Sequence, residues 1–127
     1  MRNFKELEIW TLGMEIVKEI YSLSSELPSQ EKYGLVSQIT RAAVSVPSNI
    51  AEGCAKSSEK EFKLYLERSL GSCFELETQV LIIKDLNIIE TGKIQPLLSK
   101  LQVEQKKLGG FISSVKSRLA QNQTPRT

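Results

Sequence analysis

The stretch SQITRAAVSVPSNIAEG, residues 37–53, combines two side-chain patterns that each fit a helix. An apolar stripe of the kind that packs in a core runs through Leu35, Ile39, Ala42, Val46 and Ile50. Five polar residues follow one another at steps of three, four, four and three and so share the other side: Gln38, Arg41, Ser45, Asn49 and Glu52. Since a surface helix without a special task usually carries Lys and Glu opposite its core, we expect this polar stripe to meet another surface.

Pro47 lies in the middle of the stretch, where a proline removes one backbone hydrogen bond and clashes with the carbonyl four residues earlier, at a cost of about 3 kcal/mol. The apolar periodicity nevertheless continues across it. We therefore predict one helix that begins near residue 30 or 31, with Ser29 as its cap, ends at about Cys54 and is kinked between Val44 and Pro47. Two short helices are the alternative.

Two further helices are predicted on either side of this one. Residues 4–26 carry apolar residues at alternating steps of three and four, and the pattern ends before Pro28. Ser58 and Glu61 form a capping box that starts the third helix, and Asn87 is a suitable left-handed terminator. The third helix has the longest regular core seam: Phe62, Leu66, Ser69, Cys73, Leu76, Val80 and Ile83.

The fourth helix is predicted from Thr91 to about Ala120, with Gly109 and Gly110 weakening it without ending it. Its predicted core seam is Ile94, Leu98, Leu101, Gln105, Leu108, Ile112, Val115 and Leu119. Four amphipathic helices with short connections, and no alternation typical of strands, predict an all-α fold. We expect an antiparallel up-down-up-down four-helix bundle over residues 1–120, followed by a disordered polar tail over residues 121–127.

The composition argues against several classes of function. The 127 residues form about one domain, and the absence of histidine removes the commonest general base and the usual zinc or di-iron ligand. Cys54 and Cys73 are too few and too far apart for a zinc cage or a redox pair, so we expect reduced, inert thiols. There is no apolar run of about eighteen residues and no signal peptide. We therefore predict a cytoplasmic protein that is not an enzyme and has no cofactor or metal.

The net charge of +2 is unevenly distributed. Residues 1–90 hold 10 basic and 14 acidic side chains, a balance of −4, whereas residues 91–127 hold 7 basic and 1 acidic, a balance of +6. The basic set of the fourth helix is Lys93, Lys100, Lys106, Lys107, Lys116 and Arg118. This basic set is either a solvated helix face or, repeated in a ring of subunits, a phosphate-binding surface of low sequence specificity.

The polar stripe, taken together with Ser72 and Glu75 of the third helix, also admits two interpretations. These residues form either a ligand or RNA site, or a hydrogen-bonded network that fixes helix pairing or a subunit interface. We favour the network, with a subunit contact as its role, because a partly buried Arg41 needs a carboxylate such as Glu75 or Glu52 to avoid an unpaired charge. A metal held by Glu52 and Glu75 is the least favoured interpretation, because histidine is absent.

A set of short strings extends over nearly the whole chain: Leu7 with Trp10, Pro28 with Glu31, QITRAA at 38–43, PSNIAEG at 47–53, and Gly71-Ser72 with Glu75. Together these strings resemble the 23S rRNA intervening-sequence protein family, whose members are also called four-helix-bundle proteins. The string NIAEG, with the proline that precedes it, is the most specific part of the resemblance.

The resemblance implies a small bacterial four-helix bundle that assembles as a ring, typically a homopentamer. Members are often encoded within insertions in large-subunit ribosomal RNA genes, and related bundles are accessory proteins of diversity-generating retroelements, where they bind reverse transcriptase and nucleic acid. We therefore expect a homo-oligomeric accessory or assembly protein that binds RNA or DNA electrostatically, or a nucleic-acid enzyme such as reverse transcriptase, and no membrane. The alternatives are a protein-binding scaffold without nucleic-acid contact and, last, a metal or small-molecule enzyme.

Overall fold

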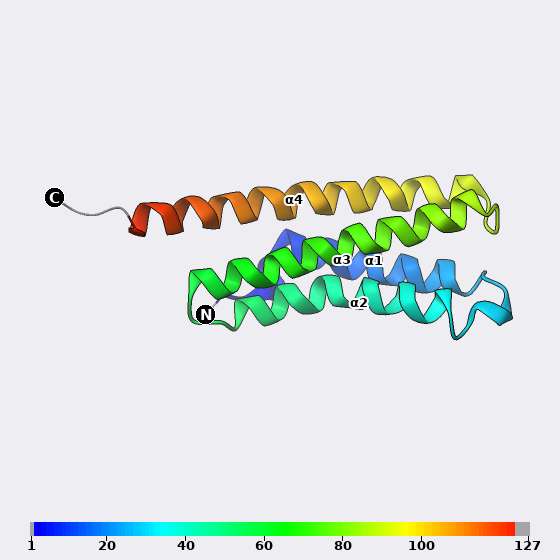
Figure 1. Cartoon of the computed structure of the whole chain (residues 1–127), viewed down its shortest axis with the longest axis horizontal. Helices are drawn as coiled ribbons and strands as arrows, with labels where there is room; N and C mark the ends of the chain where they lie inside the picture. The colour runs from blue at the N-terminus through cyan, green and yellow to red at the C-terminus, as the bar shows by residue number, and fades with distance from the viewer. Residues whose placement is uncertain (1, 124–127) are drawn as a thin grey trace.

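The structure is a computed structural model that describes residues 2–123, and this part of the chain is helical without any strand (Figure 1). Its elements are the 3₁₀ helix η1 (Phe4–Glu6), α1 (Glu8–Ser24), the 3₁₀ helix η2 (Ser29–Glu31), α2 (Leu35–Cys54), α3 (Glu59–Asp85) and α4 (Thr91–Gln123). Consecutive α-helices run in opposite directions, as the colour gradient in Figure 1 shows. The predicted all-α four-helix bundle is therefore confirmed.

Both ends of α3 carry the local features predicted for them from the sequence. Ser58 Oγ accepts a hydrogen bond from the backbone amide of Glu61 at 3.1 Å and contacts the Glu61 carboxylate at 3.2 Å, which fixes the start of the helix. Just beyond its other end Asn87 has a φ of 55°, the left-handed conformation predicted for it. Both α2 and α4 are continuous, across Pro47 and across Gly109-Gly110 respectively, whereas the kink at Pro47 stays a prediction.

The predicted starts of the first two helices are wrong by several residues. Residues 4–6 form η1, and α1 begins only at Glu8. Ser29 does not cap α2, because residues 29–31 make a separate 3₁₀ turn in which the amide of Glu31 donates to the carbonyl of Pro28 at 2.9 Å. The backbone of Gly34, with φ −104° and ψ −101°, is not helical and separates this turn from α2. The propensity of residues 30–34 for a helix is thus overridden by local turn hydrogen bonds and one glycine.

At its far end, α4 continues to Gln123, so the domain boundary expected at residue 120 falls inside the helix. Residues 124–127 of the predicted tail lie outside the described residues. With 33 residues α4 is about 50 Å long, and Figure 1 shows it extending past the ends of its neighbours. Within residues 2–123, no helix is both long and apolar enough to span a membrane.

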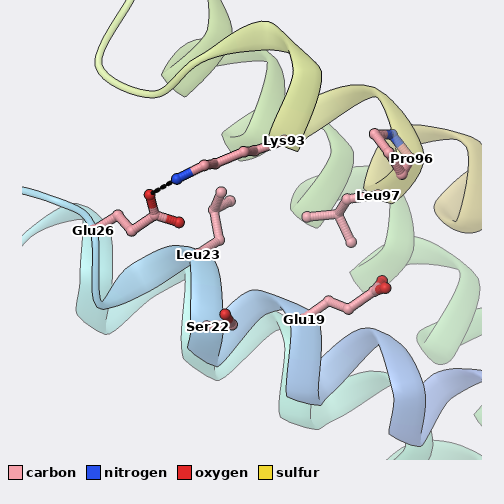
Figure 2. A pocket seen from close by; sticks show the side chains of 7 residues that line it. All are labelled: Glu19, Ser22, Leu23, Glu26, Lys93, Pro96 and Leu97. Atoms are coloured by element: carbon pink, nitrogen blue, oxygen red, sulfur yellow. Dashed lines mark hydrogen bonds and ion pairs between the residues drawn. The ribbon is translucent and has the colours of Figure 1, made fainter.

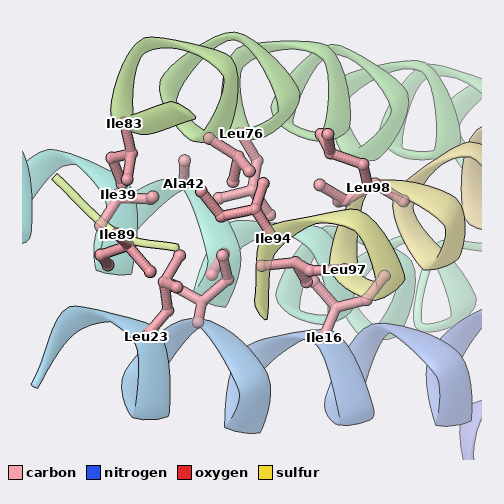
Figure 3. Close-up of a cluster of buried hydrophobic side chains, with 14 of the residues drawn as sticks. Ile16, Leu23, Ile39, Ala42, Leu76, Ile83, Ile89, Ile94, Leu97 and Leu98 are labelled. Carbon is pink, nitrogen blue, oxygen red and sulfur yellow. The ribbon is translucent and has the colours of Figure 1, made fainter. Parts of the chain in front are cut away.

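The core is divided into two clusters along the bundle. The first cluster, part of which Figure 3 shows, lies towards the α1–α2 and α3–α4 connections and includes Ile16, Ile39, Leu76 and Leu101. The second cluster lies towards the α2–α3 connection and includes Phe62, Leu66, Val46, Ile50 and Leu108. On α4, Leu101 and Leu108 belong to different clusters, and the residue between them that points inward is Glu104. The predicted seam is wrong here, because Gln105 is only half-buried whereas Glu104 is fully buried.

A strap formed by residues 2–7 closes the second cluster at the α2–α3 end. The guanidinium of Arg2 lies 3.8 Å from the centre of the Phe62 ring, and Arg2 also pairs with the Glu59 carboxylate. Its backbone amide donates to the carbonyl of Cys54 at 3.3 Å. The Phe4 ring packs edge-on against Trp10 at 5.2 Å between centroids. The strap therefore joins the beginning of the chain to α1, α2 and α3.

Candidate interaction surface

The polar stripe lies along the groove between α2 and α3. Its two half-buried members, Ser45 and Asn49, and the half-buried Ser72 of α3 are already bonded within the chain. The hydroxyls of Ser45 and Ser72 hydrogen-bond to each other at 2.5 Å across the two helices, and the Asn49 amide donates to the carbonyl of Ser45 at 2.8 Å. Deeper in the same groove the buried hydroxyl of Ser69 donates to the carbonyl of Val46 at 2.8 Å. The Ser45–Ser72 and Ser69–Val46 hydrogen bonds hold α2 against α3, whereas the Asn49 bond lies within α2.

The remaining three members of the polar stripe, and Glu75 of α3 beside them, are exposed. Among the described residues, none of these four, Gln38, Arg41, Glu52 and Glu75, forms an ion pair or a side-chain hydrogen bond. Arg41 and Glu75 nevertheless line the same open groove, of about 650 Å³, together with Gln38, Thr78, Gln79 and Ile82. Because Arg41 is exposed rather than partly buried, it needs no carboxylate inside its own chain. Both charges remain available to something outside it.

The outer face of α3 carries apolar side chains that the core does not use. Leu64, Phe74, Leu81 and Ile82 are exposed along the helix, and Leu86 is exposed at its cap. Since the inward side of α3 is apolar as well, the helix is apolar on two opposite sides, a pattern typical of a helix that is buried on both. Ile82 also lines the groove that contains Arg41 and Glu75, so this outer face is continuous with the polar stripe.

The sequence contained a signal for this outer face. Leu64, Gly71 and Thr78 each follow a core residue of α3 by two positions and repeat every seven residues, and Phe74 and Leu81 follow Gly71 and Thr78 by three. The core seam of α3 is the stronger of the two patterns and masks the weaker one. Gly71 lies on the same side of the helix, and a side-chain methyl group added there would meet no atom within 4 Å.

The basic set of α4 is largely neutralised within the chain. Lys93 pairs with Glu26 at 2.6 Å, as Figure 2 shows, and Lys107 pairs with Glu8 at 2.6 Å. Further ion pairs join Lys100 to Glu19 at 2.9 Å and to Glu15 at 3.7 Å, and Arg118 to Glu59 at 2.9 Å. Lys106 and Lys116 are exposed and form no ion pair with any described residue. The basic set is therefore not one patch of unpaired positive charge.

The ion pairs between α1 and α4 change the proton affinities of their members. The hydrogen bond from Lys107, followed by its charge, lowers the pKa of Glu8. The hydrogen bond to Glu26 raises the pKa of Lys93, and the hydrogen bond to Glu19 raises the pKa of Lys100. These groups are exposed or, for Lys100 and Glu19, partly exposed, so solvent screens the pairs and each one stabilises the fold only modestly.

The described residues offer no sign of a metal or thiol site. No group of three or more His, Cys, Asp or Glu side chains in residues 2–123 is arranged to hold a metal ion. Cys54 and Cys73 are free and buried. Burial raises the pKa of both thiols, that of Cys73 to about 12, where the charges of Glu104 and Glu77 add to the effect. Thiols with such high pKa values are poor nucleophiles at neutral pH.

The chain is similar to known proteins in its fold and in its sequence. No curated protein matches the chain. One similar solved structure is that of a protein of unknown function from the S23 ribosomal protein family of Bacteroides thetaiotaomicron VPI-5482. It superposes with a TM-score of 0.77 at 21% sequence identity, covering 82% of this chain and 97% of the other, so the likeness concerns the fold. The sequence model described as 23S rRNA-intervening sequence protein matches residues 5–110, including the polar stripe and the outer face of α3. The chain therefore belongs to the 23S rRNA-intervening sequence protein family.

Proposed function

We propose that this protein is a non-enzymatic scaffold that assembles with copies of itself through the α2–α3 side of the bundle. The observation that carries the proposal is the outer face of α3, where Leu64, Phe74, Leu81, Ile82 and Leu86 are exposed on a helix whose other side is already in the core. Burying apolar area of this kind favours association by roughly 25 cal/mol per Å². A homopentameric ring is the assembly that we expect from the family resemblance.

The charges beside this face favour a protein partner over a nucleic acid. Arg41 and Glu75 line one groove, and each lacks an ion pair in residues 2–123. A surface that presents both signs of charge next to apolar side chains can match a second copy of the same chain, whereas a phosphate backbone selects for positive charge alone. The cytoplasm is the compartment that we propose, since both cysteines are free thiols.

The assembly is tested by light scattering of the wild type and of Arg41→Ala, Phe74→Glu and Val103→Glu. Phe74 is 54% exposed on the proposed face, and Val103, at 46% exposure on α4, is the matched control outside it. We expect a wild type of several times 14.3 kDa, which Val103→Glu retains. Arg41→Ala and Phe74→Glu should shift the protein to monomer or to aggregate with unchanged helical circular dichroism. A monomeric wild type, or an unchanged mass in both variants, would refute the proposal.

Nucleic-acid binding is a second candidate function, and the exposed, unpaired Lys106 and Lys116 favour it. A ring repeats these two lysines several times, so the combined surface could hold phosphates. We expect weak, sequence-independent RNA binding at about 50 mM salt that falls steeply as salt rises and is reduced in the double variant Lys106→Ala, Lys116→Ala. A double variant of paired cations, Lys93→Ala with Lys107→Ala, serves as the control. Absence of binding at low salt excludes this function and leaves the assembly proposal intact.

A further inference from the structure

Glu104 is a carboxylate in the middle of the hydrophobic core. It lies on α4 between Leu101 of the first cluster and Leu108 of the second, and its exposed fraction is 0%. Neither of its two carboxylate oxygens has a hydrogen-bond partner among the described residues. Each of the other described acidic side chains is at least partly exposed, so Glu104 differs in kind from the surface carboxylates of α1 and α3.

The four helices meet around this side chain. A Cβ atom built on Gly13 of α1 would lie 3.1 Å from Glu104 Oε2, and 3.4 Å from both Pro47 Cβ and Val46 Cγ1 of α2. From α3, Cys73 is close enough for the Glu104 charge to act on its thiol. Gly13 therefore provides the room that the carboxyl group occupies, and the carboxyl group separates the two clusters.

The groups around Glu104 cannot neutralise a negative charge there. Gly13, Val46 and Pro47 do not titrate, and on α3 neither the Cys73 thiol nor Glu77, whose charge also acts on that thiol, can supply a positive charge. Among the described residues, the one cation that acts on Glu104 is Lys107 of its own helix, and that ammonium is already 2.6 Å from Glu8. A buried charge without a partner costs several kcal/mol, which a carboxyl group avoids by keeping its proton.

Close to Glu104, the proline of α2 interrupts the helical hydrogen-bond pattern. Pro47 has no amide hydrogen, so the carbonyl of Ala43 lacks its ordinary helical donor. Pro47 lies against the same Gly13 position as Glu104 Oε2. Burial raises the pKa of Glu104 from 4.5 to about 8, with Lys107 opposing the rise.

We propose that Glu104 is a neutral carboxylic acid in the folded bundle and that its ionisation loosens the contact between the two core clusters, so that the bundle contains a proton-operated latch. The direction of the pH effect follows from the pKa of Glu104 in the folded chain compared with its pKa in the unfolded chain. Its pKa is higher in the folded than in the unfolded chain, so the stabilisation is complete below pH 4.5, declines as the pH rises to about 8, and changes no further above that value.

The test compares urea unfolding of the wild type, Glu104→Gln and the surface control Glu90→Gln between pH 5 and pH 9. Uptake of one proton on folding makes the unfolding equilibrium constant rise roughly tenfold per pH unit between pH 5 and about 8. We expect this rise in the wild type and in Glu90→Gln, relative to a Glu104→Gln profile that lacks it. Parallel profiles for wild type and Glu104→Gln would overturn the proposal.

A second measurement does not depend on how well the variant folds. Infrared spectroscopy of the wild type at pH 6.5 should show the carbonyl stretch of one protonated carboxylic acid, which disappears as the pH passes about 8. In a Cys54→Ser background, Cys73 should then react with a thiol reagent faster than its thiolate fraction predicts, because the core beside Glu104 has opened. A wild type without the protonated band at pH 6.5 contradicts the latch. Neither measurement depends on self-association, so the two proposals can fail separately.

Discussion

Different interactions hold together the helix pair α1–α4 and the helix pair α2–α3. On the α1–α4 side, long lysine side chains of α4 reach glutamates of α1 or of the turn that follows it, in the pairs Lys93–Glu26, Lys100–Glu19 and Lys107–Glu8. Between α2 and α3, the contacts are short: serine hydroxyls, one backbone carbonyl, and Gly53 facing the Tyr65 side chain. Both pairs run along the bundle, yet only the second brings the helix backbones close together.

The difference shows how the chain distributes its charges. On the α1–α4 side, most cations of α4 form ion pairs with carboxylates of the same chain. On the α2–α3 side, small residues hold the helices together, and Arg41, Glu52 and Glu75 are left without ion pairs among residues 2–123. Charges that are already paired within the chain contribute little to binding a partner. Unpaired charges beside exposed apolar residues can form new ion pairs and bury apolar area when a partner binds. This contrast supports the α2–α3 side as the surface for assembly.

Of the substitutions that test this contrast, Gly53→Ala should change the free energy of unfolding most. The added methyl group would lie 2.8 Å from Tyr65 Cβ and 3.3 Å from the Phe62 ring, so α2 and α3 must move apart. Overpacking of this kind should lower the free energy of unfolding by about 2 kcal/mol. Gly110→Ala is the matched control, because its methyl group meets nothing and should stabilise α4 by about 1 kcal/mol. Urea unfolding of both variants decides the point, and equal effects of the two would mean that the close approach at Gly53 is unimportant.

A smaller effect is expected from Ser69→Ala, which removes the buried hydrogen bond to the Val46 carbonyl. The loss of one such bond should cost about 1 kcal/mol in the free energy of unfolding. Ser72→Ala, at a half-buried position where water can replace the hydroxyl, should cost less. If thermal or urea unfolding ranks the two variants the other way round, the Ser45–Ser72 contact is the more important link between α2 and α3.

The smallest effect is expected on the α1–α4 side, from Lys100→Met. A partly exposed ion pair contributes about 0–1 kcal/mol, and the methionine keeps most of the apolar stem, so the free energy of unfolding should change by less than about 1 kcal/mol. Pairing raises the pKa of Lys100, so its contribution is present below pH 10.5 and is lost as the pH rises through the folded value. The difference between wild type and variant should shrink in 1 M salt. A loss above 2 kcal/mol that salt does not reduce would contradict the contrast between the two sides.

The fold could be predicted from the sequence because each helix has its own periodicity and its own end signals. Ser58 with Glu61 and the left-handed Asn87 are local features, and the structure places both as predicted. The start of α2 could not be predicted as well, since the turn at residues 29–31 competes with the helix over a few local hydrogen bonds. Which residue of a seam points inward was harder still: Glu104 and Gln105 are adjacent, and both keep the spacing to Leu101 and Leu108.

The candidate site was predictable only in part. Periodicity predicted the polar stripe on one side of α2, and the Ser45–Ser72 hydrogen bond joins it to α3, whereas its role in a subunit contact stays a prediction. Three lysines of the basic set, Lys93, Lys100 and Lys107, pair with glutamates of α1 or of the turn after it, which depends on how segments far apart in sequence are aligned and is not reported by any local pattern. The buried Glu104 was hidden because a lone glutamate in an apolar seam is normally assigned to the surface.

Limited proteolysis of the strap, residues 2–7, can measure how often this end of the second cluster opens. Lys5 is exposed within the strap, and tryptic cleavage after it would detach both Arg2 and Phe4 from their aromatic neighbours. Phe62 would then lose the cation that covers its ring. The rate at which trypsin cuts at Lys5 therefore reports how often the chain's first turn lifts away from the end of the bundle.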